Sequence, residues 1–270
     1  MKFDRSKFSD ITQLAIEAAI QSGKLLKHGY STQFEVSFKP GKHNLVTEYD
    51  LASEKQIISL IRETYPDHNF LCEEEGVIHS DTEGGIKWII DPLDGTVNFA
   101  HNIPVFAVSI AAYKDGEPFC GVVYAPMYEE LFIAEKGKGA YLNGEKIAVT
   151  QTQMLEQSFL STGFPYNMDE NPHNIIERFA NFIKMGVPIR RLGSATLDMT
   201  YVAAGRFDGY WETGLGAWDC AAAQVIIQEA GGKITNWDGS EFKLADKNNT
   251  LLASNGHIHD EMVQKLKEML

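Results

Sequence analysis

Cysteine is scarce in this chain, which has only Cys72, Cys120 and Cys220 among its 270 residues. The number is odd, the three lie far apart, and no Cys-x-x-Cys pair occurs. This pattern is not that of a disulfide framework or of a cysteine-bound structural zinc site, and it suits a reducing compartment. Because residues 1–6 are polar and lack the apolar segment of a secretory signal, we expect a cytoplasmic protein.

Long apolar runs and a surplus of positive charge are absent as well. No stretch approaches the ~18 uninterrupted apolar residues that a membrane-spanning helix requires, so no membrane partner is expected. Asp and Glu outnumber Lys and Arg by 37 to 24, which gives a formal net charge of −13. Such a chain is a poor partner for nucleic acid, and it would bind a phosphate only where cations reverse the local charge.

What is present is typical of a soluble globular α/β protein, with 44% hydrophobic and 23% charged residues. The length allows one large domain or two closely packed halves. The pattern of elements changes near residue 150. We therefore expect an α+β half over residues 1–150 and an α/β half over residues 151–270, which share one interface in a single compact unit.

Periodicity predicts the elements of each half. Helical spacing of apolar residues predicts helices over residues 8–28 and about 51–65. Asp115-Gly116 and Asn143-Gly144 are hairpin signals, so residues 104–149 are predicted to form successive antiparallel strands. In the second half, the patterns predict strands over 158–161, 207–211 and 251–254, and helices over 175–185, 195–204, 217–230 and 258–270.

The most informative segment is residues 88–99, Trp-Ile-Ile-Asp-Pro-Leu-Asp-Gly-Thr-Val-Asn-Phe. A short apolar strand is predicted to stop at Asp91, because Pro92 lacks an N–H and favours an extended residue before it. Asp91 and Asp94 then point into one volume across a turn that Gly95 permits. Carboxylates this close repel each other unless a cation lies between them, and Mg²⁺ prefers such ligands. An ordinary solvated turn is the alternative, but surface turns seldom follow three apolar residues.

Other acidic side chains are candidates for the remaining ligands. Three consecutive glutamates, residues 73–75, follow a short apolar strand, although a Glu triplet is usually a solvated face. Asp219 precedes an apolar helix, where it either caps the helix or points from the second half into the cleft. The role of Asp50 is equally open, because this residue can simply cap a helix that begins after it.

Two further features mark the second half. The small residues Gly193, Ser194 and Ala195 either let a ligand approach the backbone closely or merely form a tight turn. Glu212 directly follows the predicted strand 207–211 and therefore lies at a strand end, where α/β folds place ligand contacts. Each feature is compatible with a binding site but does not by itself establish one.

Several of these features occur together in one order. They are the Asn44-Leu45-Val46-Thr47 segment followed by Asp50, the Glu73-Glu74 pair, the motif of residues 91–96, and Trp218-Asp219 followed by Gly231-Gly232. In this combination the chain resembles the inositol monophosphatase family of Mg²⁺-dependent, lithium-sensitive phosphatases, over nearly its whole length. The resemblance implies a homodimer and the layered αβαβα sandwich of the sugar phosphatases.

The resemblance also implies a set of metal ligands. One Mg²⁺ would be held by Glu73, Asp91 and the carbonyl of Leu93, and a second by Asp91, Asp94 and Asp219. A weaker third ion would lie near Glu73, and Mn²⁺ is a potential substitute for Mg²⁺. Two ions that clamp the attacking and leaving oxygens are a general solution for phosphate ester hydrolysis.

The remaining implied roles concern the attacking water and the substrate. The water would be oriented by Glu73 and Thr96, with Asp50 behind Thr96. The phosphate would rest on backbone amides near Gly95 and Thr96. The implied substrate contacts are Lys39, Asp94, Gly95, Thr96, Gly193, Ser194, Ala195 and Glu212.

The resulting prediction is a phosphomonoesterase that acts on myo-inositol 1-phosphate. Residues 96–99, Thr-Val-Asn-Phe, resemble the inositol phosphatase form of the motif, whereas nucleotidase relatives tend to have a Lys-Glu pair after the threonine. Alternative substrates are NADP, fructose 1,6-bisphosphate and adenosine 3′,5′-bisphosphate. An inactive phosphate-binding regulator on the same scaffold is a further alternative. It would be expected to have lost an acidic ligand, yet Glu73, Asp91, Asp94 and Asp219 are all present.

Overall fold

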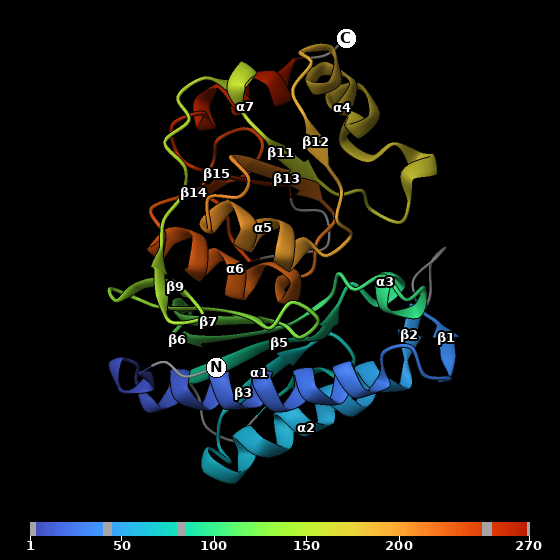
Figure 1. Ribbon diagram of the computed structural model, residues 1–270, viewed down its shortest axis with the longest axis vertical. Coiled ribbons are helices and arrows are strands. Elements are labelled where there is room, and N and C mark those ends of the chain that lie inside the picture. Colours follow the sequence, from blue (N-terminus) through green and yellow to red (C-terminus); the bar gives the residue numbers. More distant parts are fainter. Residues whose placement is uncertain (1–3, 40–44, 80–84, 245–249, 269–270) are drawn as a thin grey trace.

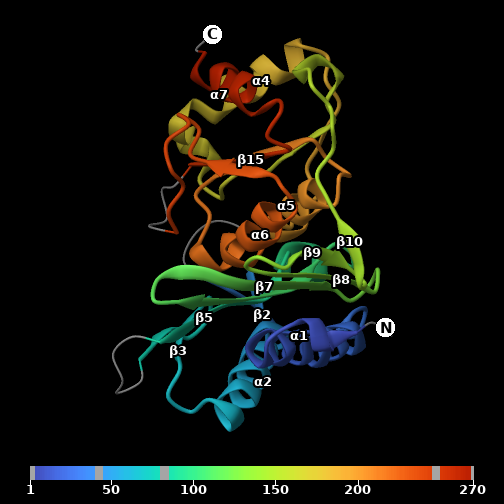
Figure 2. The same cartoon turned by 90° about the vertical axis from the view of Figure 1, so that its left-hand side faces the viewer.

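The computed structural model describes residues 4–39, 45–79, 85–244 and 250–268. Helices and sheets alternate in five layers, which are stacked from bottom to top in Figure 1 and are seen from the side in Figure 2. The helical layers are α1 (Asp10–Gly29) with α2 (Glu48–Thr64), α5 (Ala195–Ala203) with α6 (Ala217–Glu229), and α4 (Ile175–Lys184) with α7 (His259–Lys267). The expected αβαβα sandwich is therefore confirmed. Asn44, which carries part of the resemblance, lies outside the described residues, as does the end of the expected helix 258–270.

An eight-stranded sheet separates α1 and α2 from α5 and α6, with the strand order β10-β9-β8-β7-β6-β5-β3-β4. Its strands are β3 (Asn69–Cys72), β4 (Gly76–Ile78), β5 (Ile86–Asp94), β6 (Ala107–Lys114), β7 (Glu117–Ala125), β8 (Glu130–Glu135), β9 (Gly139–Leu142) and β10 (Glu145–Ile147). Neighbouring strands are antiparallel except β3 and β5, which are parallel. The expected antiparallel run over residues 104–149 is confirmed, and both hairpin signals lie at hairpin turns.

A five-stranded sheet separates α5 and α6 from α4 and α7, with the strand order β12-β11-β13-β15-β14. Its strands are β11 (Leu160–Thr162), β12 (Ile189–Arg190), β13 (Gly209–Thr213), β14 (Lys233–Thr235) and β15 (Thr250–Ser254). β11 runs parallel to β12 and β13, whereas β15 is antiparallel to β13 and β14. The first sheet ends at Ile147 and the second begins at Leu160. The division into halves near residue 150 stays a prediction.

Smaller elements complete the fold. A two-stranded hairpin of β1 (Val36–Phe38) and β2 (Leu45–Thr47) lies beside the short helix α3 (Thr96–Ala100) at one end of the layers (Figure 1). The 3₁₀ helices are η1 (Arg5–Lys7), η2 (Leu155–Gln157), η3 (Met168–Glu170) and η4 (Pro172–Asn174). Among the described residues, no helix combines the length and the apolar character needed to cross a membrane.

The position of α6 explains why it is apolar on every side. This helix lies between the two sheets, so residues 220–227 are all buried. By contrast, α1 covers only one face of a sheet, and it therefore buries one side, including Ala15 and Leu26, while Lys24 is exposed. The sheet and α6 approach so closely that a Cβ on Gly121 of β7 would overlap the Ala222 carbonyl. The middle helical layer is thus fixed tightly against the sheet that carries the aspartate motif.

The prediction that the strand stops at Asp91 is wrong, because β5 continues to Asp94. The register with β6 shifts between Asp91 and Asp94, and pairing resumes at Asp94 with Ala107. Pro92 lies in this irregular part of the strand, where its missing N–H interrupts no ladder hydrogen bond. The carbonyl of Pro92 accepts a hydrogen bond from Ser53 at 2.8 Å. Long-range pairing therefore extends a strand that the local sequence would end.

Candidate metal centre

Three aspartates from two layers meet at one end of the eight-stranded sheet. Asp91 and Asp94 lie at the end of β5, and Asp219 lies in the first turn of α6. One carboxylate oxygen from each aspartate lies within 4.8 Å of the other two. The chain thus brings together three of the four acidic side chains that the resemblance implies as ligands, all with hard oxygen donors suited to Mg²⁺.

Each aspartate is held in place by hydrogen bonds from nearby segments. Asp91 accepts from the backbone N–H of Leu93 at 3.0 Å, across the irregular part of β5. Asp94 accepts from the Ser194 hydroxyl at 2.6 Å and from the Thr196 N–H at 2.8 Å, both at the start of α5. Asp219 accepts from the N–H of Gly216 at 2.6 Å. Asp219 therefore combines the two alternatives considered for it: it caps α6, and its carboxylate also lies near those of the other two aspartates.

The electrostatics of the group call for a cation. Burial raises the pKa of Asp91 well above its usual range, and the charges of Glu73 and Asp94 raise it further. Burial also raises the pKa of Asp219, again with help from Asp94 and Glu73. The pKa of Asp94 rises to about 6 because of burial, although its hydrogen bonds from Ser194 and Thr196 oppose the rise. Such carboxylates are stable together as anions only with a compensating positive charge.

Glu73 lies in the turn between β3 and β4, near enough to Asp91 to raise the pKa of that carboxyl. The ammonium of Lys39 contacts the carboxylates of Glu73 at 2.8 Å and Glu74 at 2.5 Å. Glu54 of α2 supports this turn, since its carboxylate accepts the backbone N–H of Glu74 at 2.9 Å and that of the next residue at 2.8 Å. Glu54 was not predicted from the sequence, where its only signal is its place one helical turn after Asp50.

Asp50 connects α2 to the aspartate motif. The alternative left open for Asp50, a cap of a helix that begins at Leu51, differs from the structure in position: α2 begins at Glu48 with Thr47 as its N-cap, and Asp50 is the third helical residue of a capping box. One Asp50 oxygen accepts the N–H and the hydroxyl of Thr47, and the other accepts the Thr96 hydroxyl at 2.9 Å. Burial raises the pKa of Asp50 to about 7. Thr96 also lies 3.0 Å from the carbonyl of Leu93, so these groups form one connected set.

Gly95 permits the sharp entry into α3. Its φ is +98°, in the left-handed region, and a Cβ would lie only 2.8 Å from the carbonyl oxygen of Val105. Asn98 of α3 then donates to Val105 at 2.8 Å and to the Leu192 carbonyl at 2.9 Å. Asn98 therefore joins the motif to the segment before α5. This role was not predicted, although Asn98 lies within the informative segment 88–99.

The second half brings its predicted residues to the same region. Gly193 has φ of +84°, Ser194 is the N-cap of α5, and Ala195 is the first residue of that helix. Glu212 does not follow a strand as predicted, because β13 continues through it to Thr213. Its side chain is buried and lies against the backbone of Gly163, where a Cβ would overlap the carboxylate.

The carboxylate of Glu212 has its own local partner. It accepts a short hydrogen bond from the hydroxyl of Tyr210, two residues earlier in β13. Burial raises its pKa to about 7, with a small further rise from Asp94. Glu212 is therefore a buried acid of the second half whose pKa is influenced by the charge of Asp94.

Comparison with known proteins identifies the relatives of this chain. The model of the inositol monophosphatase family matches residues 7–270. The chain belongs to this family. Nus factor SuhB of Haemophilus influenzae is 40% identical in an alignment of 261 positions that covers 95% of this chain and 96% of that protein.

Solved structures agree with this family membership. The extragenic suppressor protein suhB of Bartonella henselae matches with a TM-score of 0.91 and 36% identity, over 97% of this chain and 100% of that one. Inositol monophosphatase from Anabaena matches with a TM-score of 0.85 and 38% identity, over 96% of each chain. The expected family and fold are both confirmed.

Members of the inositol monophosphatase family are small-molecule phosphatases that generally depend on Mg²⁺, and the three aspartates supply a donor set that fits such an ion. The names of the relatives differ, since one is called an inositol monophosphatase and another a Nus factor. The inositol substrate and the absence of a nucleic-acid partner therefore stay predictions for this family member.

Proposed function

We propose that this protein is a Mg²⁺-dependent phosphomonoesterase that hydrolyses myo-inositol 1-phosphate to inositol and phosphate. The observation that carries the proposal is the meeting of Asp91, Asp94 and Asp219 oxygens from two layers within 4.8 Å of one another. A cytoplasmic homodimer is part of the same proposal.

The acidic groups divide into two overlapping ligand sets. Glu73, Asp91 and the carbonyl of Leu93 would hold one ion, and Asp91, Asp94 and Asp219 would hold another. A third, weaker ion would lie near Glu73, and Mn²⁺ would substitute for Mg²⁺. When bound, the ions supply positive charge for the phosphate and the leaving oxygen and make the attacking water more acidic.

The chain's own residues orient the water. Thr96 donates its hydroxyl proton to Asp50 at 2.9 Å, so the lone pairs of its oxygen are free to accept from a water in the site. The carboxylate of Glu73 would offer a second acceptor. A water held between the two would have its oxygen directed at phosphorus, and the carboxylate of Glu73 would receive its proton.

In an in-line attack the water and the leaving alcohol would lie on opposite sides of phosphorus, and a second water would protonate the leaving oxygen. The backbone N–H groups of Gly95 and Thr96 would hold the phosphate, because Gly95 brings the chain close without a side chain. Lys39, held beside Glu73, would add a positive charge at the entrance. The hydroxyl groups of the alcohol would contact Asp94, Gly193, Ser194, Ala195 and Glu212.

Release of inorganic phosphate tests the proposal. Purified protein is given myo-inositol 1-phosphate, NADP, fructose 1,6-bisphosphate and adenosine 3′,5′-bisphosphate, with Mg²⁺ and with a chelator. The expected result is Mg²⁺-dependent release that is fastest with the inositol ester and is inhibited by Li⁺. Faster release from another ester would mean that this ester, and not myo-inositol 1-phosphate, is the preferred substrate of the same phosphatase reaction. Binding without any turnover would identify a phosphate-binding regulator.

A further inference from the structure

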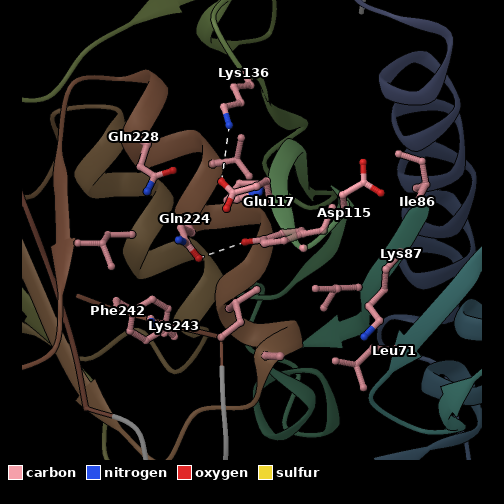
Figure 3. A pocket seen from close by; sticks show the side chains of 18 of the residues that line it. Leu71, Ile86, Lys87, Asp115, Glu117, Lys136, Gln224, Gln228, Phe242 and Lys243 are labelled. Carbon is pink, nitrogen blue, oxygen red and sulfur yellow. Dashed lines mark hydrogen bonds and ion pairs between the residues drawn. The ribbon is translucent and has the colours of Figure 1, made fainter. Parts of the chain in front are cut away.

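Two cavities among the described residues are lined by none of the residues assigned above to metal or substrate. The larger, of about 800 Å³, lies beside α6, and its lining contains three lysines and four carboxylates (Figure 3). Lys136, for example, lies 3.7 Å from Glu117. Because both signs of charge are present in nearly equal number, this lining favours neither an anion nor a cation.

The smaller cavity, of about 430 Å³, lies in the outermost part of the fold, where α4 and α7 cover the five-stranded sheet (Figure 1). Arg178 of α4, Lys267 of α7, and Trp237 and Asp238 after β14 contribute to its lining. The five-stranded sheet separates these helices from α6, which carries Asp219. The cavity is therefore distinct from the metal centre, and its volume is that of a small-molecule site.

Arg178 is held in this cavity by two contacts. Its Nε–H donates to the carbonyl of His173 at 2.7 Å, and its guanidinium lies 5.6 Å from the ring centre of Trp237. The Trp237 ring is fixed in turn, because it is buried and its indole N–H donates to the Leu251 carbonyl at 2.9 Å. Within the described part of the chain, both Nη groups of Arg178 are left without an acceptor. A fixed guanidinium with free N–H groups is well suited to bind an oxyanion.

The charges around Arg178 do not neutralise it. Lys267 adds a second cation, and Asp238 is the one carboxylate among the described lining residues. Hydrogen bonds from Ser240 lower the pKa of Asp238, and the charge of Lys267 lowers it further. Neither Arg178 nor Lys267 forms an ion pair with any described residue. Burial lowers the pKa of Arg178, as expected for a cation without an anionic partner. The cavity therefore carries local positive charge, in a chain with a net charge of −13.

The backbone before α4 has an unusual conformation that positions Arg178. Asn171, His173 and Asn174 have φ between +46° and +53°, in the left-handed region that costs free energy for residues other than glycine. The carbonyl that fixes the Nε of Arg178 belongs to His173, within this segment. Such backbone persists where the surrounding structure requires it and is concentrated at ligand sites.

Thr250, at the start of β15, supplies a second donor to the cavity. Its hydroxyl oxygen accepts the backbone N–H of Trp237 at 3.2 Å. The hydroxyl proton of Thr250 has no acceptor among the described residues, so it is available to a ligand. The free donors of Arg178 and Thr250 therefore line the same cavity.

We propose that this cavity binds the phosphate group of a small molecule, at a second site separate from the metal centre. The Nη groups of Arg178 would donate to two phosphate oxygens in the parallel arrangement that a guanidinium favours. Thr250 would donate its hydroxyl proton to the phosphate, and Lys267 would add positive charge. The inference does not depend on the reaction proposed for the metal centre.

Titration of the metal-free protein with phosphate tests the inference. A chelator removes metal ions, so the acidic metal centre repels phosphate and no ester is hydrolysed there. Inorganic phosphate, glycerol 3-phosphate and acetate are the probes, and chloride keeps the ionic strength constant. The Arg178 Nε–H and Trp237 indole N–H resonances are followed by NMR.

We expect both phosphate probes to shift these two resonances saturably at millimolar concentration. Acetate, which has less charge and one oxygen fewer to bind, should act at least about tenfold more weakly. The tighter of the two phosphate probes shows whether the ligand is free or esterified phosphate, and either result supports the site. Equal binding of acetate, or no shift with either phosphate probe, would overturn the inference.

Variants separate the guanidinium contact from a general effect of charge. Arg178→Gln should weaken phosphate binding, followed at Trp237, at least about tenfold. Arg190→Gln is the matched control, since Arg190 also lies over an aromatic ring and donates to one backbone carbonyl, but does not line the cavity. Unchanged binding in Arg178→Gln, or an equal loss in Arg190→Gln, would contradict the assignment. The comparison of phosphate with acetate in the wild-type protein decides the question even if Arg178→Gln does not fold.

Discussion

Asp91 is the side chain on which the proposed metal centre should depend most, because Glu73, Asp94 and Asp219 all act on its pKa. Asp91→Asn should lower Mg²⁺-dependent phosphate release by more than about 100-fold, since even groups behind metal ligands are worth 10–100-fold. The same change should raise the stability of the metal-free protein at neutral pH, because it removes a buried anion from a cluster of like charges. Phosphate release and thermal unfolding with a chelator measure the two effects.

The exposed Asp260 offers a matched control for this substitution. Its side chain is 90% exposed, and within the described residues its one ion pair is with Lys233 at 3.3 Å. Asp260→Asn should change neither phosphate release nor thermal unfolding appreciably. A wild-type rate in Asp91→Asn would remove that residue from the metal centre.

Glu212 should govern which alcohol is accepted. Its carboxylate is held by Tyr210 and lies against Gly163, and the proposal places it among the contacts of the alcohol. Glu212→Gln should therefore change the ratio of kcat/KM between the inositol ester and fructose 1,6-bisphosphate, by about tenfold for one altered hydrogen bond. Steady-state kinetics on both esters measure it. An equal loss for every ester would place Glu212 in the phosphate chemistry instead.

At the scale of elements, the helices and hairpins were predictable because their signals are local. The hairpins at residues 115–116 and 143–144 follow from turn chemistry, and α1 follows from its apolar spacing. The end of β5 was not predictable, because its pairing of Asp94 with Ala107 across an irregular register depends on a neighbouring strand. The same holds for Glu212, since β15 pairs with β13 up to Thr213.

In the candidate site, too, the local features were predictable and the long-range contacts were not. The carboxylates of the aspartate motif could be recognised from their spacing, but the groups that hold them could not. Glu54 supports a turn twenty residues away, and Asn98 reaches Leu192 across 94 positions of sequence. Local propensity contains no information on such contacts, because they form only when the layers pack.

The turn at the end of β5 gives a prediction for the element as a whole. Gly95→Ala should destabilise the protein by about 3 kcal/mol, because it adds left-handed strain and a Cβ only 2.8 Å from the Val105 oxygen. Gly116→Ala is the matched control: its φ is +84°, but a Cβ there meets nothing within 4 Å, so about 1 kcal/mol is expected. Denaturant unfolding measures both. Equal losses would mean that close packing at Gly95 does not matter.

At the scale of the whole molecule, the proposed metal centre would join layers that packing and hydrogen bonds, such as that from Ser194 to Asp94, already hold together. Asp91 and Asp94 belong to the eight-stranded sheet, whereas Asp219 belongs to α6 between the sheets. Without a cation, these layers meet at a buried patch of like charge. Metal binding should therefore stabilise the stack as a unit and should act most strongly where the carboxyls are ionised.

This arrangement predicts the pH dependence of stability in the metal-free protein. Burial raises the folded-state pKa of Asp94 to about 6, and those of Asp50 and Glu212 to about 7, above the unfolded values of about 4. The folded state then binds more protons than the unfolded state between about pH 4 and pH 7. Its free energy of unfolding should consequently fall by several kcal/mol as the pH rises through that window.

Mg²⁺ should reverse this trend, because the bound ion favours the ionised carboxylates and compensates their charge. Denaturant unfolding across the same pH window, with a chelator and with saturating Mg²⁺, measures both curves. The gap between them should widen as the pH rises, and it should shrink in Asp91→Asn, which removes one of the charges that the ion offsets. A metal-free stability that stays flat or rises toward neutral pH would mean that the aspartates are not held together as buried anions.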